Sequence, residues 1–456
     1  MPLGRTGLNA VLHDVRIIDP HSGRDGTGDV AVVDGVIVQP ADPMPEGTVH
    51  VDGRGLVCAP AFVDLHCHLR EPGFEEKETI ASGTAAAAAG GFGLVSCMPN
   101  TRPPLDTLAR LQALRDIIER DARVPVLPVA AVTLGRRGDS LVDIRALAAA
   151  GVAGFSDDGD YVADAVIMRD ALSQAAGVGL CVMDHAQDGR LVSGGVLNEG
   201  DVARRLKLRG MAAEAEELAV ARDIALARMT GGHVHIQHIT TARAVDMVSR
   251  AKDEGVHVTA EATPSHLLLS DEDTVLVDPS GVASFNTNAK VNPPLRGHDD
   301  VAGVVRGITD GTIQAIATDH APHTAADKAC APGAAAFGIS VFETALATVL
   351  TLYHRGDVSL KQLVQCLTFG PAAVLGLRFV YPSMAIGREA GLVLFDAEAS
   401  WVVDPSRFRS RGKNTPLEGR TLRGMVLATI VNGRCVYIAD ALGSRCSGGF
   451  LVEELT

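Results

Sequence analysis

Short apolar runs alternate with helical segments through the middle of the chain, and this alternation limits the possible folds. Eight apolar runs can be counted, from "LVCAPAFVDLHCH" to "TIQAIATD". Helical segments such as "DTLARLQALRDIIERD" and "DDVAGVVRGITDG" separate most of the runs. Strands that alternate with helices are typical of a parallel sheet covered by helices. Eight such units predict an α/β fold, specifically a (β/α)₈ TIM-like barrel.

An open, doubly wound sheet is the alternative arrangement of the same units. A nucleotide-binding sheet of that kind would show a GxGxxG sequence after its first strand, or a Walker sequence. Neither pattern is present in the chain. The closed barrel is therefore the favoured fold.

Both ends of the chain differ from the middle. Runs such as "DVAVVDGVIV" near the start and "GMVLATIVNGRCVYI" near the end have the texture of short strands and turns. We predict that residues 1–55 and 383–456 form one small β-sandwich domain, and that residues 56–382 form the barrel. The stretch 267–296, between the last two barrel strands, is long and weakly patterned, as functional loops often are.

Charge and composition exclude several classes of protein. The net charge of −14 disfavours a nucleic-acid binder, because phosphate contacts need clustered Lys and Arg. No signal peptide or membrane span is expected, since neither apolar pattern appears. The eight cysteines are scattered without a CxxC pair and are typical of reduced thiols. We expect a cytoplasmic protein that binds neither nucleic acid nor a membrane.

Polar side chains stand where most of the apolar runs end. In a barrel, the carboxyl ends of all strands lie on one face, where active sites are built. Residues far apart in sequence are therefore expected to meet in one pocket. They are His66, His68, Asn100, Asp157, Asp158, His185, His238 and Asp319.

The pair His66 and His68 predicts a metal site. Residues two apart on a strand project to the same face, so both imidazoles point inward and Cys67 faces the helices. A strand-end histidine is often only hydrogen-bonded, and HxH alone is a weak signal. Burying this many polar groups without a metal would cost several kcal/mol. Imidazole and carboxylate suit Zn²⁺, and four histidines with two carboxylates fit two ions.

The run "HVHIQH" offers two sets of histidines. His233 and His235 share one face of a strand, while His238 belongs to the other. On this reasoning only one set faces the barrel interior, and the strand-end position favours His238 as the ligand. His233 and His235 are then structural, and His320 in "TDHAPH" is a supporting or loop residue.

Several motifs in this order resemble the amidohydrolase superfamily and, within it, the dihydroorotase family. They are "VDLHCHLREPG", "MPNT", "FSDDG", "MDH", "HIQHIT", "NPPLR" and "ATDHAPH". The resemblance covers nearly the whole chain. Related hydantoinases and dihydropyrimidinases usually bridge two metals with a carboxylated lysine, whereas "FSDDG" offers aspartate. The resemblance implies that Asp158 is the bridge and Asp157 its neighbour, a choice that spacing alone does not make.

The resemblance also implies the remaining roles. Arg70, Asn100 and His323 would bind the substrate carboxylate, and Asn292 would contact the ring. A guanidinium is the natural bidentate partner of a carboxylate, although Arg70 could instead pair with Glu71 or Glu75 at the surface. One zinc would be held by His66, His68 and Asp319 and a second by His185 and His238, with one or two ions per subunit and two expected.

The implied reaction is the reversible conversion of N-carbamoyl-L-aspartate to L-dihydroorotate in pyrimidine biosynthesis. Bound zinc would lower the pKa of water to about 7, and Asp319 would transfer the proton as the catalytic residue. The segment after Asp319, "HTAADKACAPGAAAFG", could act as a lid. A homodimer and a complex with aspartate transcarbamoylase are implied partners. Another cyclic amidase, or a scaffold subunit for that transcarbamoylase, is the alternative.

Overall fold

Parallel strands occupy the centre of the chain, as the continuous apolar runs predict. In the computed structural model, which describes residues 7–40, 44–377 and 383–447, they form the orders β6-β7-β8 and β16-β13-β12-β9. Their residues are mostly buried, which explains why these runs are apolar throughout rather than alternating. The strands are β6 (Phe62–Cys67), β7 (Phe92–Cys97), β8 (Val126–Pro128), β9 (Cys181–Asp184), β12 (His233–Ile236), β13 (Val258–Ala262) and β16 (Ala315–Ile316).

Three isolated bridges join these sheets into a closed barrel. Phe155 bridges Ala130 on one side and Val182 on the other, in parallel register. Cys67 and His320 make the parallel bridge between the first and last strands. The predicted fourth run, "GVAGFSDD", therefore occupies its place in the ring, with its bridges at Phe155 and a further hydrogen bond from the Ala153 amide to the Pro128 carbonyl at 2.9 Å. The predicted (β/α)₈ barrel is confirmed.

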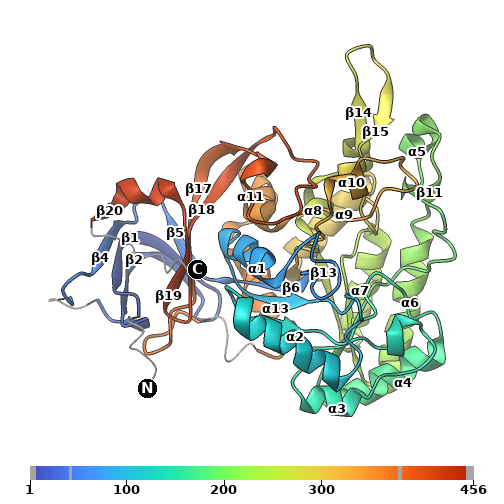
Figure 1. The fold of residues 1–456 in the computed structure, drawn as a ribbon, viewed down its shortest axis with the longest axis horizontal. Coiled ribbons are helices and arrows are strands. Elements are labelled where there is room, and N and C mark those ends of the chain that lie inside the picture. The colour runs from blue at the N-terminus through green and yellow to red at the C-terminus, as the bar shows by residue number, and fades with distance from the viewer. Residues whose placement is uncertain (1–6, 41–43, 378–382, 448–456) are drawn as a thin grey trace.

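Helices surround the barrel strands (Figure 1). Most begin at a side-chain cap: the hydroxyl of Thr79 accepts from the amide of Ser82, and Thr107, Asp164 and Thr241 cap their helices in the same way. The helices are α1 (Ile80–Ala89), α2 (Leu108–Asp121), α3 (Ile144–Ala149), α4 (Ala165–Ala176), α5 (Asp201–Leu206), α6 (Glu214–Thr230), α7 (Ala242–Asp253), α8 (Pro264–Leu268), α9 (His298–Thr309), α10 (Ala325–Lys328), α11 (Ala345–Arg355), α12 (Leu360–Leu367) and α13 (Phe369–Val374).

None of the described helices is both long and apolar enough to pass through a bilayer. Short 3₁₀ helices complete the described helical elements. They are η1 (Leu134–Arg136), η2 (Asp271–Thr274), η3 (Thr287–Ala289), η4 (Phe342–Thr344), η5 (Pro405–Arg407) and η6 (Asp440–Arg445).

The two ends of the chain pair with each other in one sheet, seen beside the barrel in Figure 1. Its order is β19-β18-β17-β5-β1-β2-β3, and β4 joins β1 and β20. Its strands enclose a separate apolar cluster that includes Val15, Ile17 and Leu392. They are β1 (Ala10–Asp19), β2 (Arg24–Val33), β3 (Val36–Val38), β4 (Val49–Asp52), β5 (Val57–Pro60), β17 (Leu392–Val402), β18 (Thr421–Val431), β19 (Arg434–Ile438) and β20 (Cys446–Ser447).

The first predicted barrel run divides into two strands. Its first part, β5, pairs with β1 and β17 in the terminal sheet, and its second part, β6, pairs with β7 in the barrel. Pairing in the terminal sheet therefore extends to Pro60, beyond the predicted boundary at residue 55. The other predicted boundary follows residues 378–382, which lie outside the described residues. The extents of the two domains stay predictions.

The long stretch before the last strand forms a projecting hairpin. Strands β14 (Val275–Val277) and β15 (Ala283–Phe285) pair antiparallel and extend away from the barrel in Figure 1. A two-residue pair, β10 (Leu197–Asn198) with β11 (Gly210–Met211), is parallel. The stretch predicted as an irregular loop thus has secondary structure of its own.

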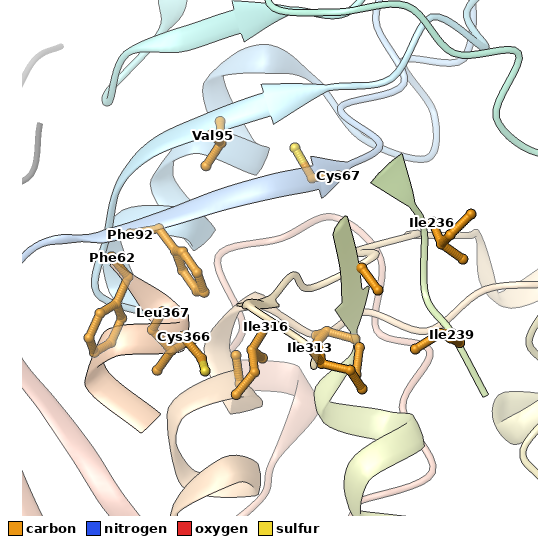
Figure 2. Close-up of a cluster of buried hydrophobic side chains, with 14 of the residues drawn as sticks. Phe62, Cys67, Phe92, Val95, Ile236, Ile239, Ile313, Ile316, Cys366 and Leu367 are labelled. Atoms are coloured by element: carbon orange, nitrogen blue, oxygen red, sulfur yellow. The ribbon is translucent and has the colours of Figure 1, made fainter. Parts of the chain in front are cut away.

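The space between barrel strands and helices is filled with apolar side chains. Figure 2 shows Phe62 and Phe92 close together, with ring centroids 5.7 Å apart. Cys67 belongs to the same cluster as Val95 and Ile80, so it faces the helices as strand alternation predicts. Its thiol donates to the carbonyl of Ser96 at 3.3 Å. Cys67 therefore lies on the opposite side of its strand from His66 and His68.

The fourth barrel position should be sensitive to loss of Phe155. This side chain is fully buried in the cluster between the barrel strands and the helices, so its truncation would leave a cavity there. We expect Phe155→Ala to reduce the free energy of unfolding by about 3–5 kcal/mol. Leu108→Ala, at a side chain 50% exposed on α2, is the matched control. Thermal unfolding measures both, and equal midpoints would contradict the importance of this position.

Candidate metal centre and substrate cavity

Histidines and carboxylates meet at the carboxyl ends of the barrel strands, as predicted. His66 lies within β6 and His68 just beyond it, while His185 directly follows β9. His238 comes two residues after β12, and Asp319 three residues after β16. All of these side chains are buried. Two groups have ligand atoms within 4.8 Å of one another: His66, His68 and Asp319, and His66, Asp158 and His238.

Asp158 lies at the centre of this cluster. Its Oδ1 is 3.2 Å from His66 Nε2 and 3.7 Å from both His185 Nδ1 and His238 Nε2. Its Oδ2 is 3.4 Å from His68 Nε2. One carboxylate therefore faces the four predicted histidine ligands, which is the position a bridge between two ions would need.

Asp157 faces the other way. Its Oδ1 accepts hydrogen bonds from the amides of Val132 and Thr133 at 2.8 and 3.0 Å. Its Oδ2 accepts from the Thr133 hydroxyl. These bonds connect the fourth strand position to the chain after β8, and they leave Asp157 no free oxygen toward the histidines.

Asp319 approaches the cluster from the last strand. Its Oδ1 is 3.0 Å from His68 Nε2 and 3.6 Å from His66 Nε2. Its own amide donates to the His66 carbonyl at 2.9 Å. The hydrogen bond that closes the barrel therefore also fixes the distance between these two residues.

Three site residues have backbone conformations that non-glycine residues rarely adopt. The φ angles are 62° at Arg70, 32° at His238 and 45° at Asp319. Such conformations cost of the order of 1 kcal/mol or more, and they persist where the surrounding structure fixes them. All three residues have just left a strand or its extension, so the turn aims each side chain back over the barrel mouth.

Buried imidazole nitrogens without partners test whether the cluster suits a metal. Within the described part of the chain, neither His66 Nε2 nor His238 Nδ1 has a hydrogen-bond partner. A buried nitrogen without a partner is unfavourable, whereas a bound divalent ion would satisfy it. Imidazole with carboxylate is the donor set of zinc and similar ions. The donor set and the unpaired His66 nitrogen therefore fit a metal.

The imidazoles also lower the pKa values of the two carboxylates, Asp158 and Asp319. Burial alone would raise the pKa of Asp158, but the charge of His66 and the neighbouring imidazoles of His185 and His238 hold that pKa well below its usual range. Burial likewise opposes ionisation of Asp319, and the neighbouring His66 and His68 lower its pKa. Both carboxylates are therefore anionic, as metal ligands must be.

Sequence reasoning missed Glu261, which supports the centre from β13. Its Oε1 lies 2.7 Å from His66 Nδ1 and accepts from the His238 amide at 3.3 Å, and its Oε2 is 3.1 Å from His235 Nε2. His66 must donate through Nδ1, which directs Nε2 toward the cluster. A carboxylate behind a ligating histidine is the usual outer support of a metal site.

His235 therefore lies inside the barrel together with His238, contrary to the prediction that only one set faces inward. Strand β12 ends at Ile236, so alternation no longer applies at His238. The structural role predicted for His235 fits its hydrogen bonds to Thr259 and Glu261. His233 is likewise hydrogen-bonded to Thr259.

Asn100 contacts the centre as well as the cavity above it. Its Oδ1 lies 2.9 Å from His68 Nδ1, and its Nδ2 donates to Asp158 Oδ2 at 3.4 Å. Asn100 can therefore fix the tautomer of His68, with Nε2 directed at Asp158 and Asp319. The sequence prediction gave this residue only a contact with substrate.

A cavity of about 180 Å³ opens above the cluster. All predicted site residues except His66 line it, together with the backbone of Gly159 and Gly338 and the ring of Phe337. His66 lies beneath. The predicted residues in its wall are His68, Arg70, Asn100, Asp158, His185, His238, Asn292, Asp319 and His323.

Arg70 makes one corner of this cavity cationic, beside the His323 ring, whose pKa burial and the charge of Arg70 lower to about 2. Arg70 Nη2 is 3.2 Å from His323 Nε2, and Arg70 Nε donates to the Pro322 carbonyl. Glu71 and Glu75 are instead bonded to backbone amides, so neither forms the surface ion pair considered above. Burial lowers the pKa of Arg70 to about 10, yet the guanidinium remains charged at neutral pH.

Asn292 lines the same cavity beside His185. Its Nδ2 is 3.1 Å from His185 Nε2, and its buried Oδ1 has no partner among the described residues. An unused acceptor that lines a cavity is available to a ligand N–H group. The segment after Asp319 also reaches the cavity, because Phe337 and Gly338 line it and the Phe337 carbonyl contacts His323 Nε2 at 2.8 Å.

The His320 side chain lies outside this cavity, as predicted. Its Nδ1 accepts from the Val341 amide at 3.0 Å, and its Nε2 is 3.4 Å from Glu78 Oε2. Its carbonyl accepts from the His68 amide across the barrel closure. His320 is therefore a supporting residue.

Fold and site together define a barrel hydrolase with a histidine–carboxylate metal centre. Solved structures share this architecture: L-hydantoinase (dihydropyrimidinase) from Arthrobacter aurescens matches with a TM-score of 0.82 and 22% identity over 98% of both chains. Dihydropyrimidinase from Brevibacillus agri matches with a TM-score of 0.79 and 20% identity over 94% of this chain and 95% of that one. At this identity the likeness concerns the fold.

Sequence comparison gives the particular family. Residues 55–244 match the family model described as dihydro-orotase-like. Dihydroorotase from Anaeromyxobacter dehalogenans is 43% identical over 93% of this chain and 97% of its own length. Dihydroorotase from Syntrophus aciditrophicus is 42% identical over 95% of this chain and 100% of its own. The chain belongs to the dihydroorotase family of cyclic amide hydrolases.

Loss of the Glu261 carboxylate should weaken metal binding. Glu261→Gln keeps the shape of the side chain but removes the charge that orients His66. We expect affinity for Zn²⁺ to fall about 10–100-fold, measured by competition with a chromophoric chelator. Glu343→Gln is the control, because that carboxylate accepts from the amides of Arg409 and Ser410, away from the cluster. Equal affinities in both variants would show that Glu261 does not support the site.

Proposed function

We propose that the protein is a zinc-dependent dihydroorotase, which interconverts N-carbamoyl-L-aspartate and L-dihydroorotate in pyrimidine biosynthesis. One observation carries the choice of substrate: the Arg70 guanidinium faces the same small cavity as the metal-ligand cluster. A planar, charged donor pair is suited to a carboxylate, which dihydroorotate has and dihydrouracil lacks. Membership of the dihydroorotase family supports the same choice.

The proposed ligand set follows from the cluster. His66, His68 and Asp319 would hold one zinc ion, His185 and His238 the second, and Asp158 both. When bound, the ions would supply Lewis acidity that activates water and polarises the amide carbonyl. The distances from Asp158 to all four histidines support its role as the bridge.

The cavity walls would orient the substrate. Arg70 and His323 would bind its carboxylate, and Asn100 would add an amide contact from the side of His68. The unpaired Asn292 Oδ1 would accept a ring N–H. These contacts together would hold the ring amide over the centre, with the carboxylate pointing away from it.

Asp319 would move the proton. In the hydrolytic direction, water adds to the amide carbonyl carbon and the ring C–N bond breaks. Asp319 would accept a proton from that water and deliver it to the departing ring nitrogen. Its ionised carboxylate, 3.0 Å from His68 Nε2, supports this role. Ring closure follows the same path in reverse, with loss of water.

Two alternatives are less well supported. A hydantoin- or dihydropyrimidine-hydrolysing enzyme has no need of Arg70 in the cavity. A scaffold subunit has no need of metal ligands, whereas this chain keeps all six proposed ligands, and five of them form two close groups.

The proposed assembly and location rest on other grounds. A homodimer and a complex with aspartate transcarbamoylase are proposed from resemblance to bacterial relatives. A cytoplasmic location is proposed because all eight cysteines are free thiols. Chromatography with light scattering, with and without the transcarbamoylase, would measure both associations.

Removal of the Asp158 carboxylate should empty the metal centre. We expect Asp158→Ala to lose most bound zinc and at least about 10³-fold of kcat, since both ions would lose a shared ligand. Asp157→Ala is the adjacent control, expected to keep its zinc although it loses three hydrogen bonds. Zinc content by atomic emission and thermal unfolding measure both variants. Loss of zinc from Asp157→Ala alone would reassign the bridge.

A substrate panel tests the function. Zinc-loaded protein should turn over dihydroorotate in preference to dihydrouracil, hydantoin and allantoin. Arg70→Met should raise KM for dihydroorotate about 10–100-fold, because a charge-assisted hydrogen-bond pair is lost. Arg70→Lys, which keeps the charge but not the planar fork, should recover part of that loss.

Turnover of the carboxylate-free rings should not fall in Arg70→Met. Preference of the unaltered protein for dihydrouracil would refute the proposed substrate. No turnover of any compound, together with no bound zinc, would favour the scaffold.

A further inference from the structure

A second cavity lies on the far side of His323. It has a volume of about 470 Å³, compared with about 180 Å³ for the cavity over the metal-ligand cluster. His323 lines both, so its imidazole is a shared wall. The larger cavity is framed by η3, by α10 and by the chain around residues 411–414.

The Lys and Arg side chains that line this second cavity are not matched by any Asp or Glu among the described residues of its wall. Lys328, Arg411 and Lys413 line it, with the polar residues Thr287 and Thr324 between them. A nearby acid, Asp327, is 3.4 Å from the Lys77 ammonium, which pairs with it. A concave site with several cations and no anion attracts negatively charged ligands.

Lys328 supplies a buried ammonium that forms no ion pair with the residues that the structure describes. Its side chain is only 4% exposed, and its ammonium donates to the carbonyls of Thr287, Lys290 and Ala336 at 3.1, 3.2 and 2.8 Å. These carbonyls satisfy the N–H groups but do not neutralise the charge. Burial, reinforced by the charges of Lys290 and Arg70, lowers the pKa of Lys328 to about 7. A bound anion would relieve this repulsion.

Arg411 is the free cation of the cavity. Its backbone amide donates a hydrogen bond to Glu78 Oε1 at 3.2 Å, which fixes the position of its main chain. Across the described ranges, its guanidinium forms no hydrogen bond or ion pair. Lys413 differs, since its ammonium donates to the carbonyls of Phe408 and Ser410. Arg411 can therefore be substituted without breaking contacts within the protein.

We propose that this cavity is a second anion-binding site, which takes a small dianion such as a dicarboxylate or a phosphate. Arg411 binds the anion directly, and Lys328 and Lys413 provide the surrounding positive charge. The site is separate from the catalytic cavity, and its occupancy does not depend on the proposed reaction.

His323 connects the two cavities. Its amide donates to Asn414 Oδ1 at 2.9 Å, and Asn414 also lines the second cavity. On the other side, the His323 ring contacts Arg70. An anion in the second cavity would therefore act on the residues that face the substrate carboxylate, and should alter KM more than kcat.

Calorimetry of the zinc-loaded protein tests the site. Succinate and inorganic phosphate, titrated separately, distinguish a carboxylate site from a phosphate site. We expect saturable binding of at least one, and a Kd about tenfold higher in Arg411→Met. Arg388→Met, at an exposed arginine beside the terminal sheet, is the matched control and should bind as the unaltered protein does. The anion should change KM in the unaltered protein and not in Arg411→Met.

Proton uptake gives a second readout. Binding of succinate at pH 7, or of phosphate at about pH 8, where each anion is already mostly doubly charged, is measured in two buffers of different ionisation enthalpy. It should take up a fraction of a proton, because an adjacent anion raises the pKa of Lys328. The charged and titratable groups around Lys328 are Arg70, Lys290, His323, Asp327 and Cys330.

Three results would overturn the proposal. The first is no saturable binding of either anion. The second is binding that Arg411→Met leaves unchanged and Arg70→Met abolishes, which would place the anion in the catalytic cavity. The third is binding without proton uptake, which would place it away from Lys328. None of these results depends on whether dihydroorotate is turned over.

Discussion

Two backbone hydrogen bonds between the first and last strands hold the rest of this structure together. The Asp319 amide donates to the His66 carbonyl, and the His68 amide donates to the His320 carbonyl, both at 2.9 Å. They close the barrel, and three of the four residues that make them, His66, His68 and Asp319, also contribute side chains to the metal-ligand cluster. Closing the ring and assembling the cluster are therefore one event, which explains how ligands more than 250 residues apart acquire a fixed separation.

An apolar barrel must also accommodate a strongly polar centre. The solution is a layer of carboxylates beneath the histidines. Glu261 orients His66, and Asp64 accepts from both the amide and the hydroxyl of Thr318 at 2.7 Å. Asp64 is fully buried, and this burial raises its pKa to about 7. Such networks are favourable only when nearly every member is paired.

The sequence was sufficient to predict the fold class and to predict residues that the fold brings together. The length of the apolar runs and the polar residues at their ends can be read locally from the sequence. The barrel topology then predicts that these polar residues meet in one pocket. Glu261 was not predicted, because a single acidic residue inside "VHVTAEAT" forms no motif with its neighbours in sequence. Its role becomes visible only in the fold, where β13 lies beside β12. His235 was placed by alternation alone, which fails once a strand ends. Resemblance was needed to choose Asp158 over Asp157, since both follow Phe155 at the same strand end.

The fourth strand position has a consequence for how accurately the centre is built. The Asp158 side chain has a single methylene group, so its carboxylate can adopt fewer positions than that of a longer side chain. The main chain must place it, and backbone hydrogen bonds hold the chain on both sides: the Ser156 amide donates to the Ala130 carbonyl at 2.8 Å and the Phe155 amide to the Cys181 carbonyl at 3.2 Å. The Ser156 hydroxyl accepts from the Asp158 amide at 3.0 Å, and Arg136 donates to the Asp158 carbonyl at 2.6 Å. The position of the Asp158 carboxylate therefore depends on the placement of the backbone rather than on side-chain flexibility. Residues that are not metal ligands, but that hold this backbone, thus help to determine the geometry of the centre.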